Sequence, residues 1–274
     1  MAGGRAYRPA GESIDMKQAI KALLAKAGWE LRRRPAEVPV PAPVQPELPD
    51  LSDRERRIID RVRPYTMTSP ERIAAIIAAV THLEQQRIPG AIVECGVWRG
   101  GSTMAAALTL LDLGQPSRDL HLFDTFSGMP PPTEADKSHD NHSAEVLLAQ
   151  DQPGTGIWCY ADLADVKRNL ASTAYPEGRV HFVQGKVEDT LPAAAPDKIA
   201  MLRLDTDWYE STRHELEHLY PRLQPGGIMI VDDYGHWQGA RKAVDEFLAA
   251  LPQAPFLHRI DYTGRLLVKP AAGR

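Results

Sequence analysis

The fold of this chain is decided by the stretch Ala91-Ile-Val-Glu-Cys-Gly-Val-Trp-Arg-Gly-Gly-Ser-Thr103. Its apolar opening, residues 91–93, predicts a buried parallel strand, and its three glycines predict a tight turn. An apolar helical pattern begins at Ser102, so a helix N-terminus with free N–H groups should follow the turn. Only one glycine precedes the three-residue gap, which differs from the G-x-G-x-x-G spacing of dinucleotide-binding enzymes. The stretch therefore predicts a strand, a turn and a helix whose backbone can come close to a ligand.

The composition is typical of one α/β domain with an appendage. The 274 residues are 43% apolar and 25% charged, with a net charge of −4, which suits a soluble domain. No apolar run approaches the roughly 20 residues of a membrane span, and the N-terminus lacks the apolar region and cleavage site of a signal peptide. The two cysteines, Cys95 and Cys159, form neither a disulfide framework nor a zinc-binding pattern. We expect a cytoplasmic protein.

The first 35 residues differ from the rest in charge. They carry eight Lys or Arg and three acids, a net charge of +5, which leaves −9 for the remainder. A basic arm of this kind can bind nucleic acid or a membrane surface, but a solvated helix face explains it more simply. Because the main body is acidic, neither nucleic acid nor a membrane is expected as a partner.

Three regions follow from the sequence pattern. Residues 1–34 form an arm with an amphipathic helix, which Ser13 can cap and which runs to about Leu31. Residues 35–50 contain six prolines, which favour an extended polyproline II linker. Residues 51–274 form the main domain, and the arm is expected to pack on a partner subunit or to remain a tethered element.

The main domain alternates between helix and strand patterns. Two helices with N-cap signals come first, because Ser52 and Glu55 form a capping box and Ser69 precedes Pro70 at the favoured first helical position. After the opening strand, the expected elements are strands at 119–123, 179–183, 198–204 and 228–231, helices at 102–113, 162–171, 211–223 and 238–250, a turn at 225–227 and a terminal hairpin at 256–268. This order predicts a doubly wound, mostly parallel, seven-stranded Rossmann-like sheet with a C-terminal antiparallel hairpin.

The long segment 125–160 interrupts this alternation. It is rich in Gly, Pro, His and acids, and a loop of this length inside a compact domain is usually functional. We expect it to be a lid, or else disordered. His139 and His142 lie in it; either could reach a substrate hydroxyl, although surface histidines in a mobile loop are the simpler interpretation.

Acidic residues occupy four of the predicted strand ends, where open α/β sheets bind their ligands. These residues are Glu94, Asp124, Asp205 with Asp207, and Asp232 with Asp233. A carboxylate at position 124 can accept both hydroxyls of a nucleoside ribose, or it can cap the following loop. The later acids would repel one another unless a cation neutralised them, and hard oxygen ligands favour Mg²⁺ over zinc. Asp207 and Asp233 could equally cap the next helices.

Eight motifs in order resemble the macrocin O-methyltransferase family (the TylF/MycF/NovP type) within the class I S-adenosylmethionine methyltransferases. They are Tyr65-Thr-Met-Thr-Ser69, Val93-Glu-Cys-Gly-Val-Trp-Arg-Gly-Gly-Ser102, Phe123-Asp-Thr-Phe126, Gly128-Met-Pro130, Leu202-Arg-Leu-Asp-Thr-Asp-Trp-Tyr-Glu-Ser-Thr212, Leu219-Tyr-Pro221, Pro225-Gly-Gly227 and Val231-Asp-Asp-Tyr234. The resemblance covers about residues 60–250. It implies a Mg²⁺-dependent enzyme that methylates a sugar hydroxyl of an antibiotic such as a macrolide or an aminocoumarin.

The resemblance also implies roles for individual residues. Asp205, Asp232 and Asp233 would hold the metal, and Asp205 would be the general base, with Asp207 as its rival. Where the family tends to have Gly between these last two acids, Thr206 stands here. The implied cofactor-binding residues are Thr66, Met67, Glu94, Gly96, Ser102, Asp124, Ser127 and Glu188, with the last of these on the adenine side.

Other functions remain open on the sequence alone. The same chemistry could act on a phenol, a catechol or a cell-surface sugar, and a small-molecule hydroxyl is the expected partner in every case. A nicotinamide-dependent oxidoreductase is disfavoured by the missing dinucleotide fingerprint. A non-catalytic scaffold would have no need for a cluster of mutually repelling acids. We expect a homodimer or a higher homo-oligomer.

Overall fold

The computed structural model describes residue 26 and residues 48–150 and 159–271. The chain divides into two units, residues 1–47 and residues 48–274. Of the first unit only Lys26 is described, and it is helical. The rest of the predicted arm, and most of the predicted linker, therefore lie outside the described residues. Among the described residues, no helix has both the length and the apolar character that a membrane crossing requires.

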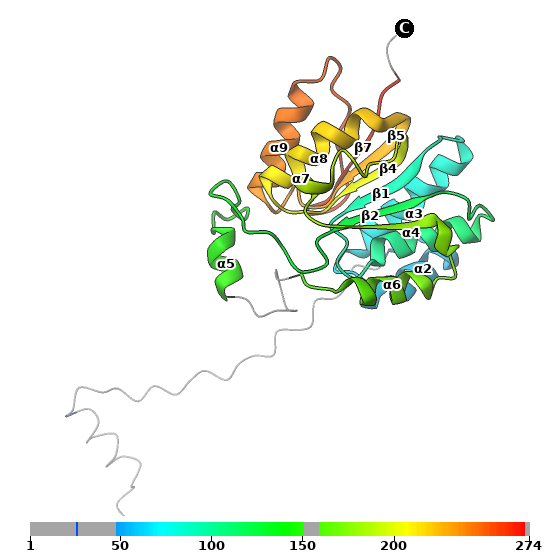
Figure 1. The fold of residues 1–274 in the computed structure, drawn as a ribbon, viewed down its shortest axis with the longest axis horizontal. Coiled ribbons are helices and arrows are strands. Elements are labelled where there is room, and N and C mark those ends of the chain that lie inside the picture. The colour runs from blue at the N-terminus through cyan, green and yellow to red at the C-terminus, as the bar shows by residue number, and fades with distance from the viewer. Residues whose placement is uncertain (1–25, 27–47, 151–158, 272–274) are drawn as a thin grey trace, which may run out of the picture. The chain divides into compact units, whose positions relative to one another are not determined.

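A seven-stranded sheet forms the centre of the second unit (Figure 1). Its order is β3-β2-β1-β4-β5-β7-β6. The strands are β1 (Ala91–Cys95), β2 (Leu120–Asp124), β3 (Val180–Gln184), β4 (Ile199–Leu204), β5 (Leu223–Val231), β6 (His258–Arg259) and β7 (Arg265–Val268). The first five are parallel, and β7 pairs antiparallel with both β5 and β6. This confirms the predicted doubly wound sheet with its terminal hairpin.

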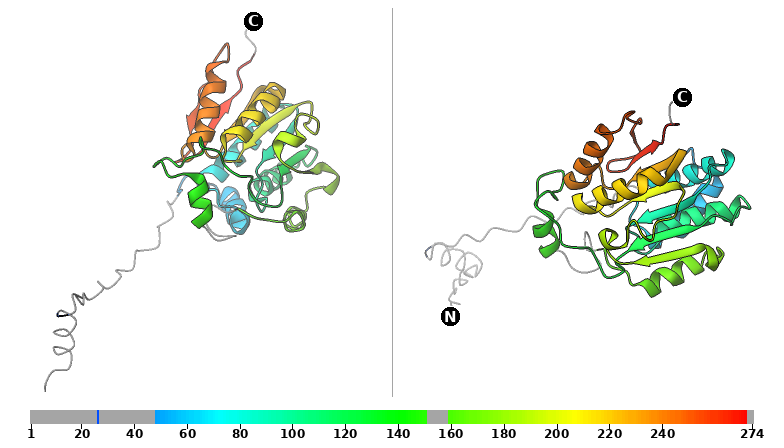
Figure 2. Two further views of the ribbon diagram at one scale, coloured as in Figure 1. Left: turned by 60° about the vertical axis from the view of Figure 1, so that its left-hand side comes forward. Right: turned by 45° about the horizontal axis from the view of Figure 1, so that its top comes forward.

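Helices cover both faces of the sheet (Figures 1 and 2). They are α2 (Asp53–Val62), α3 (Pro70–Gln85), α4 (Gly101–Asp112), α6 (Leu163–Ala171), α7 (Val187–Thr190), α8 (Tyr209–Leu219) and α9 (Gln238–Ala249), with short 3₁₀ turns at Arg63–Tyr65, Glu177–Arg179 and Tyr220–Arg222. A further helix, α5 (Ala144–Gln150), lies apart from the sheet (Figure 1). One apolar cluster joins α2, α3, α4 and α6 to the sheet, and a second joins α7, α8 and α9 to its other face. Burial of both strand faces explains why the strands read as nearly continuous apolar runs.

The predicted helix starts are present in detail. The Ser52 N–H donates to Glu55 Oε2 at 2.8 Å while the Glu55 N–H donates to Ser52 Oγ at 3.3 Å, which is the reciprocal pair of a capping box. At the next helix, Ser69 Oγ accepts from the Arg72 N–H at 3.2 Å, and Pro70 occupies the first helical position. Caps of this kind contribute about 1 kcal/mol each.

One predicted turn is wrong, because Pro225-Gly-Gly227 lies inside β5. Gly226 has φ +78°, and a Cβ on Gly227 would lie 2.9 Å from the Ala200 carbonyl oxygen. The pairing of β4 with β5 shifts register between Ile199 and Met201. The glycines therefore serve a strand irregularity, where the backbones come unusually close, and not a chain reversal.

The predicted lid contains a helix, α5, and its central part is fastened to the domain. Asp136 is fully buried; its Oδ1 accepts from the Tyr209 N–H at 2.8 Å and its Oδ2 from the Thr133 N–H at 2.7 Å. Residue Ser138 forms a β-bridge with Trp237, and Ala144 packs in an apolar cluster with the same tryptophan. Residues 133–144 are thus anchored to the domain at the start of α8, by Asp136, and at the start of α9, where Ser138 and Ala144 contact Trp237.

Candidate active site

A cavity of about 360 Å³ opens at the carboxyl ends of the five parallel strands. The position is where doubly wound sheets bind their ligands. Six of the predicted cofactor residues line it, namely Thr66, Met67, Gly96, Ser102, Asp124 and Glu188. The acids Asp205, Asp207, Asp232 and Asp233 line it too. The strand-end acids that the sequence singled out therefore share one cavity, with the exception of Glu94.

The glycine turn brings parts of the chain itself together. Gly96 has φ +78°, and a Cβ there would lie 1.9 Å from the backbone oxygen of Asp205. A Cβ on Gly101 would lie 2.6 Å from the Tyr65 carbonyl oxygen. Side chains at these positions would force β4 and the 65–68 segment away from β1. From the sequence we expected the glycines to leave room for a ligand. The structure shows that they also let the neighbouring segments of the chain pack closely against the turn.

Asp124, at the end of β2, holds that turn in place. Its Oδ2 accepts from the N–H groups of Val97 at 2.7 Å and Trp98 at 3.2 Å, and its Oδ1 accepts from the Phe126 N–H at 2.7 Å. Each carboxylate oxygen can accept two hydrogen bonds. The Thr125 hydroxyl also lies 3.4 Å from Oδ1, but its single proton is directed to the Gly128 carbonyl oxygen at 2.5 Å. Oδ1 therefore retains room for a ligand hydroxyl, and the same carboxylate acts as the loop cap that the sequence allowed as an alternative.

Three predicted residues lie away from the cavity wall. Glu94 is buried below it, accepting from Arg203 Nη1 at 2.7 Å and from the Thr103 hydroxyl; burial raises the pKa of Glu94, which the guanidinium opposes. Ser127 is exposed on the loop after β2. His142 is exposed and lies 3.0 Å from Asp140. None of these three lines the cavity.

Two arginines that the sequence interpretation left without a role bind the acids. Arg203, on β4 and only 2% exposed, donates from Nη1 to Asp205 Oδ2 at 2.6 Å and from Nη2 to Asp232 Oδ1. Arg72, on α3, donates from Nη1 to Asp232 Oδ2. Both oxygens of Asp232 therefore bond to a guanidinium. The repulsion that suggested a metal is partly neutralised by the protein's own cations, which charge patterning alone could not reveal.

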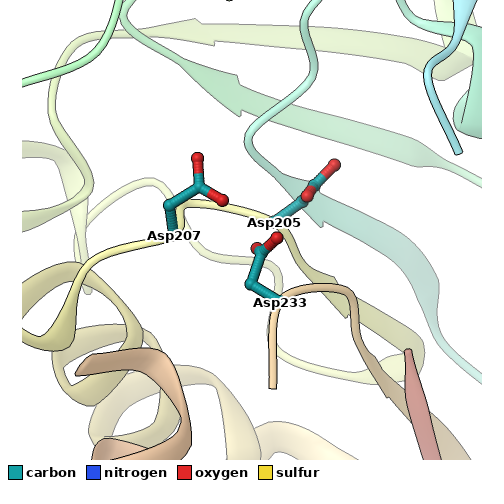
Figure 3. Close-up of side chains that lie close together, drawn as sticks. All are labelled: Asp205, Asp207 and Asp233. Atoms are coloured by element: carbon teal, nitrogen blue, oxygen red, sulfur yellow. The ribbon is translucent and has the colours of Figure 1, made fainter. Parts of the chain in front are cut away.

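Asp205, Asp207 and Asp233 form the remaining acidic cluster (Figure 3). Each offers one oxygen, and these atoms all lie within 4.8 Å of one another. Burial and then mutual repulsion raise the pKa of Asp233 well above its usual range; burial raises the pKa of Asp205 similarly, against the pull of Arg203. Burial raises the pKa of Asp207 to about 7. A divalent cation would relieve these costs, and a donor set of oxygens alone fits Mg²⁺.

The cavity is also lined by His236 and Tyr262, which no sequence motif indicated. The Tyr262 hydroxyl lies 3.0 Å from His236 Nδ1 and 2.8 Å from Nδ1 of His139 in the predicted lid. His139 is exposed and does not line the cavity itself. A tyrosine hydroxyl has only one proton, so one of the two histidines must donate to it. These contacts connect residues 133–144, through His139, to the terminal hairpin, through Tyr262.

Comparisons with known proteins identify relatives of this chain. The sequence model described as macrocin O-methyltransferase (TylF) matches residues 44–269. A Streptomyces olivaceus 8-demethyl-8-(2,3-dimethoxy-alpha-L-rhamnosyl)-tetracenomycin-C 4'-O-methyltransferase is 33% identical over 77% of this chain and 79% of its own length. The mycinamicin III 3''-O-methyltransferase of Micromonospora griseorubida is 33% identical over 67% of this chain and 70% of its own.

A solved structure resembles the fold as well. The O-methyltransferase NovP superposes with a TM-score of 0.66 at 32% identity, covering 76% of this chain and 83% of NovP. The match of the family model, over residues 44–269, includes the sheet, the glycine turn and the acidic strand ends described above. The chain therefore belongs to the macrocin O-methyltransferase family, and it is an S-adenosylmethionine-dependent O-methyltransferase.

Proposed function

We propose that this enzyme methylates a sugar hydroxyl of a glycosylated natural product. Support comes from the names of two relatives, which specify methyl transfer to a rhamnosyl-tetracenomycin and to mycinamicin III. The observation that carries the proposal is the group of carboxylates Asp205, Asp207 and Asp233 in the same cavity as the glycine turn. An alcohol is a poor nucleophile until it loses its proton, and carboxylates at that point can take it.

The donor side of the cavity is the glycine turn. S-adenosylmethionine would lie along residues 96–102, with Thr66 and Met67 on its other side. Its ribose would lie near Asp124 Oδ1, which can accept a hydrogen bond from a ribose hydroxyl. Glu188 lines the wall beyond β3, which suits contact with the adenine. Glu94 and Ser127 are left out of this proposal because they do not line the cavity.

The acceptor side would hold Mg²⁺. The set implied by the family resemblance (Asp205, Asp232, Asp233) and the set that converges in this structure (Asp205, Asp207, Asp233) share two members, so we assign Asp205 and Asp233 as constant ligands. When bound, such an ion lowers the pKa of a neighbouring hydroxyl. Cation binding by Asp207→Asn and Asp232→Asn identifies the third ligand, because the variant that weakens binding more is the one that has lost it.

The proton would pass to an aspartate. Asp205 is the proposed general base, and Asp207, with a pKa near 7, is the alternative. As the hydroxyl proton moves to the carboxylate, the oxygen–methyl bond forms while the methyl–sulfur bond breaks, leaving S-adenosylhomocysteine. Holding donor and acceptor in line would supply much of the acceleration.

A coupled assay tests this function. Purified enzyme, S-adenosylmethionine and Mg²⁺ are incubated with mycinamicin III, with simple phenols and catechols, and with free sugars, and S-adenosylhomocysteine and a 14-Da mass gain (one CH₂, from the arithmetic of methylation) are measured. Turnover of the glycoside, its loss with EDTA and its return with Mg²⁺ are expected. For the variants Asp207→Asn and Asp232→Asn, the control is His142→Gln, an exposed change away from the cavity. Preference for a phenol would overturn the proposed sugar acceptor. Activity that survives chelation would overturn the proposed dependence on Mg²⁺.

A further inference from the structure

The contact between Arg72 and Asp232 has a consequence for the cation site. Asp232 stands outside the group of carboxylates that converge within 4.8 Å, although its neighbour Asp233 is in it. Its Oδ2 bonds to Arg72 Nη1 and its Oδ1 to Arg203 Nη2. Arg72 lies on a helix, α3, whose position is fixed by the apolar cluster below it. The guanidinium thus occupies an oxygen that a metal would need.

We propose that Arg72 competes with the divalent cation for Asp232 and thereby sets the affinity of the site. This inference rests on the proposed function, because it concerns the same acidic cluster. With Arg72 in place, Asp232 is neutralised and held aside. When Arg72 Nη1 lets go, the freed oxygen can join Asp205 and Asp233, and the site becomes complete.

The surroundings of Arg72 make this exchange feasible. Its Nε donates to Asp261 Oδ2 at 2.9 Å, so the guanidinium has a second carboxylate that can retain it. A Cβ on Gly264 would lie 2.7 Å from Arg72 Cδ, which shows that this glycine makes space for the side chain. Arg203 has no comparable alternative, because apart from the Thr68 hydroxyl its remaining partners, Glu94 and Asp205, are themselves part of the buried network.

The charge of Arg72 and its contact act in the same direction. A positive charge beside the cluster repels a second cation, and the hydrogen bond removes a ligand oxygen. Arg72→Met removes both effects, so we expect it to tighten cation binding by about tenfold or more. It should still fold, because Asp232 keeps Arg203 and Asp261 keeps Ser69 Oγ at 2.6 Å and the Gly264 N–H at 2.7 Å.

The test is Mn²⁺ titration by electron paramagnetic resonance on the full chain. The control is Arg118→Met, which removes an equally buried arginine from its 2.5 Å pair with Glu84, away from the cavity. Arg72→Met should raise the Mn²⁺ affinity and Arg118→Met should leave it unchanged. If Arg72→Met does not fold, Arg72→Lys carries the test, because a single ammonium replaces the fork and a smaller gain is expected. Equal affinity in the variant and the wild type would refute the proposal.

A double-mutant cycle separates competition for Asp232 from simple charge repulsion. In an Asp232→Asn background the contested carboxylate is gone, so Arg72→Met should bring a clearly smaller gain, from charge repulsion alone. A gain that persists in full in this background would overturn the proposal. This outcome can be told apart from a failure of the proposed function. If the wild type binds no Mn²⁺, or binds it at a site that Asp233→Asn does not abolish, the proposed metal site is refuted. If the wild type and Arg72→Met bind Mn²⁺ with equal affinity, only the role of Arg72 is refuted.

Discussion

Removal of Arg203 should be the most damaging single change near the site. Its guanidinium bonds to Glu94, Asp205 and Asp232 and also donates to Thr68 Oγ1 at 3.0 Å. Arg203→Met would leave Glu94, which is 2% exposed, as a buried carboxyl group with only the Thr103 hydroxyl as partner. Removing one partner of a buried ion pair costs about 3–5 kcal/mol.

The partner substitution shows where this cost comes from. In Glu94→Gln/Arg203→Met the buried charge is gone, while Asp232 keeps Arg72 and the partly exposed Asp205 can be solvated. The double variant should therefore recover about 2 kcal/mol or more relative to Arg203→Met alone. Urea denaturation gives the free energies of unfolding, and an unchanged m-value shows that the folded states are comparable. A loss below about 1 kcal/mol for Arg203→Met, or no recovery in the double variant, would refute this reasoning.

Three further predictions concern the framework. Gly96→Ala should lower the free energy of unfolding by about 3 kcal/mol or more, because its Cβ would lie 1.9 Å from the Asp205 backbone oxygen. Gly114→Ala, at φ +68° with nothing within 4 Å, should lower it by only about 1 kcal/mol. Thermal and urea unfolding compare the two variants. Asp136→Ala should cost about 1–3 kcal/mol and speed amide exchange of residues 133–144, which unchanged exchange would contradict. Burial lowers the pKa of His121 from 6.5 to about 4, and the unfolded chain binds that proton first. Stability should thus fall as the pH decreases from 6.5 towards 4, less so in His121→Gln; an identical pH profile in that variant would exclude His121 as the cause.

Local sequence signals located the backbone of the site well. The capping box at Ser52, the Ser69 cap with Pro70, and the glycine turn each depend on chemistry within a few residues, so each was predictable. The alternation of apolar runs with helical patterns then predicted the parallel sheet, because parallel strands that are buried on both faces consist of nearly continuous apolar residues. The misread segment was Pro225-Gly-Gly227, where glycine serves a strand irregularity and looks like a turn signal.

Side-chain partnerships could not be predicted in the same way. Arg72 and Asp232 are 160 residues apart in sequence, and Arg203 and Glu94 are 109 apart. A sequence shows that charges exist, but which carboxylate an arginine reaches depends on the packing of α3 against the sheet. For the same reason Glu94 looked like a cofactor ligand and is instead half of a buried ion pair. His236 and Tyr262 meet only because the terminal hairpin folds back over the cavity.

A crystal structure with S-adenosylhomocysteine and Mn²⁺ bound tests the central claim most directly. The account predicts the nucleoside along the glycine turn, with its ribose within hydrogen-bonding distance of Asp124, and an anomalous Mn²⁺ peak between Asp205 and Asp233. Electron density for the nucleoside elsewhere, or a cation that contacts neither of these aspartates, would contradict it.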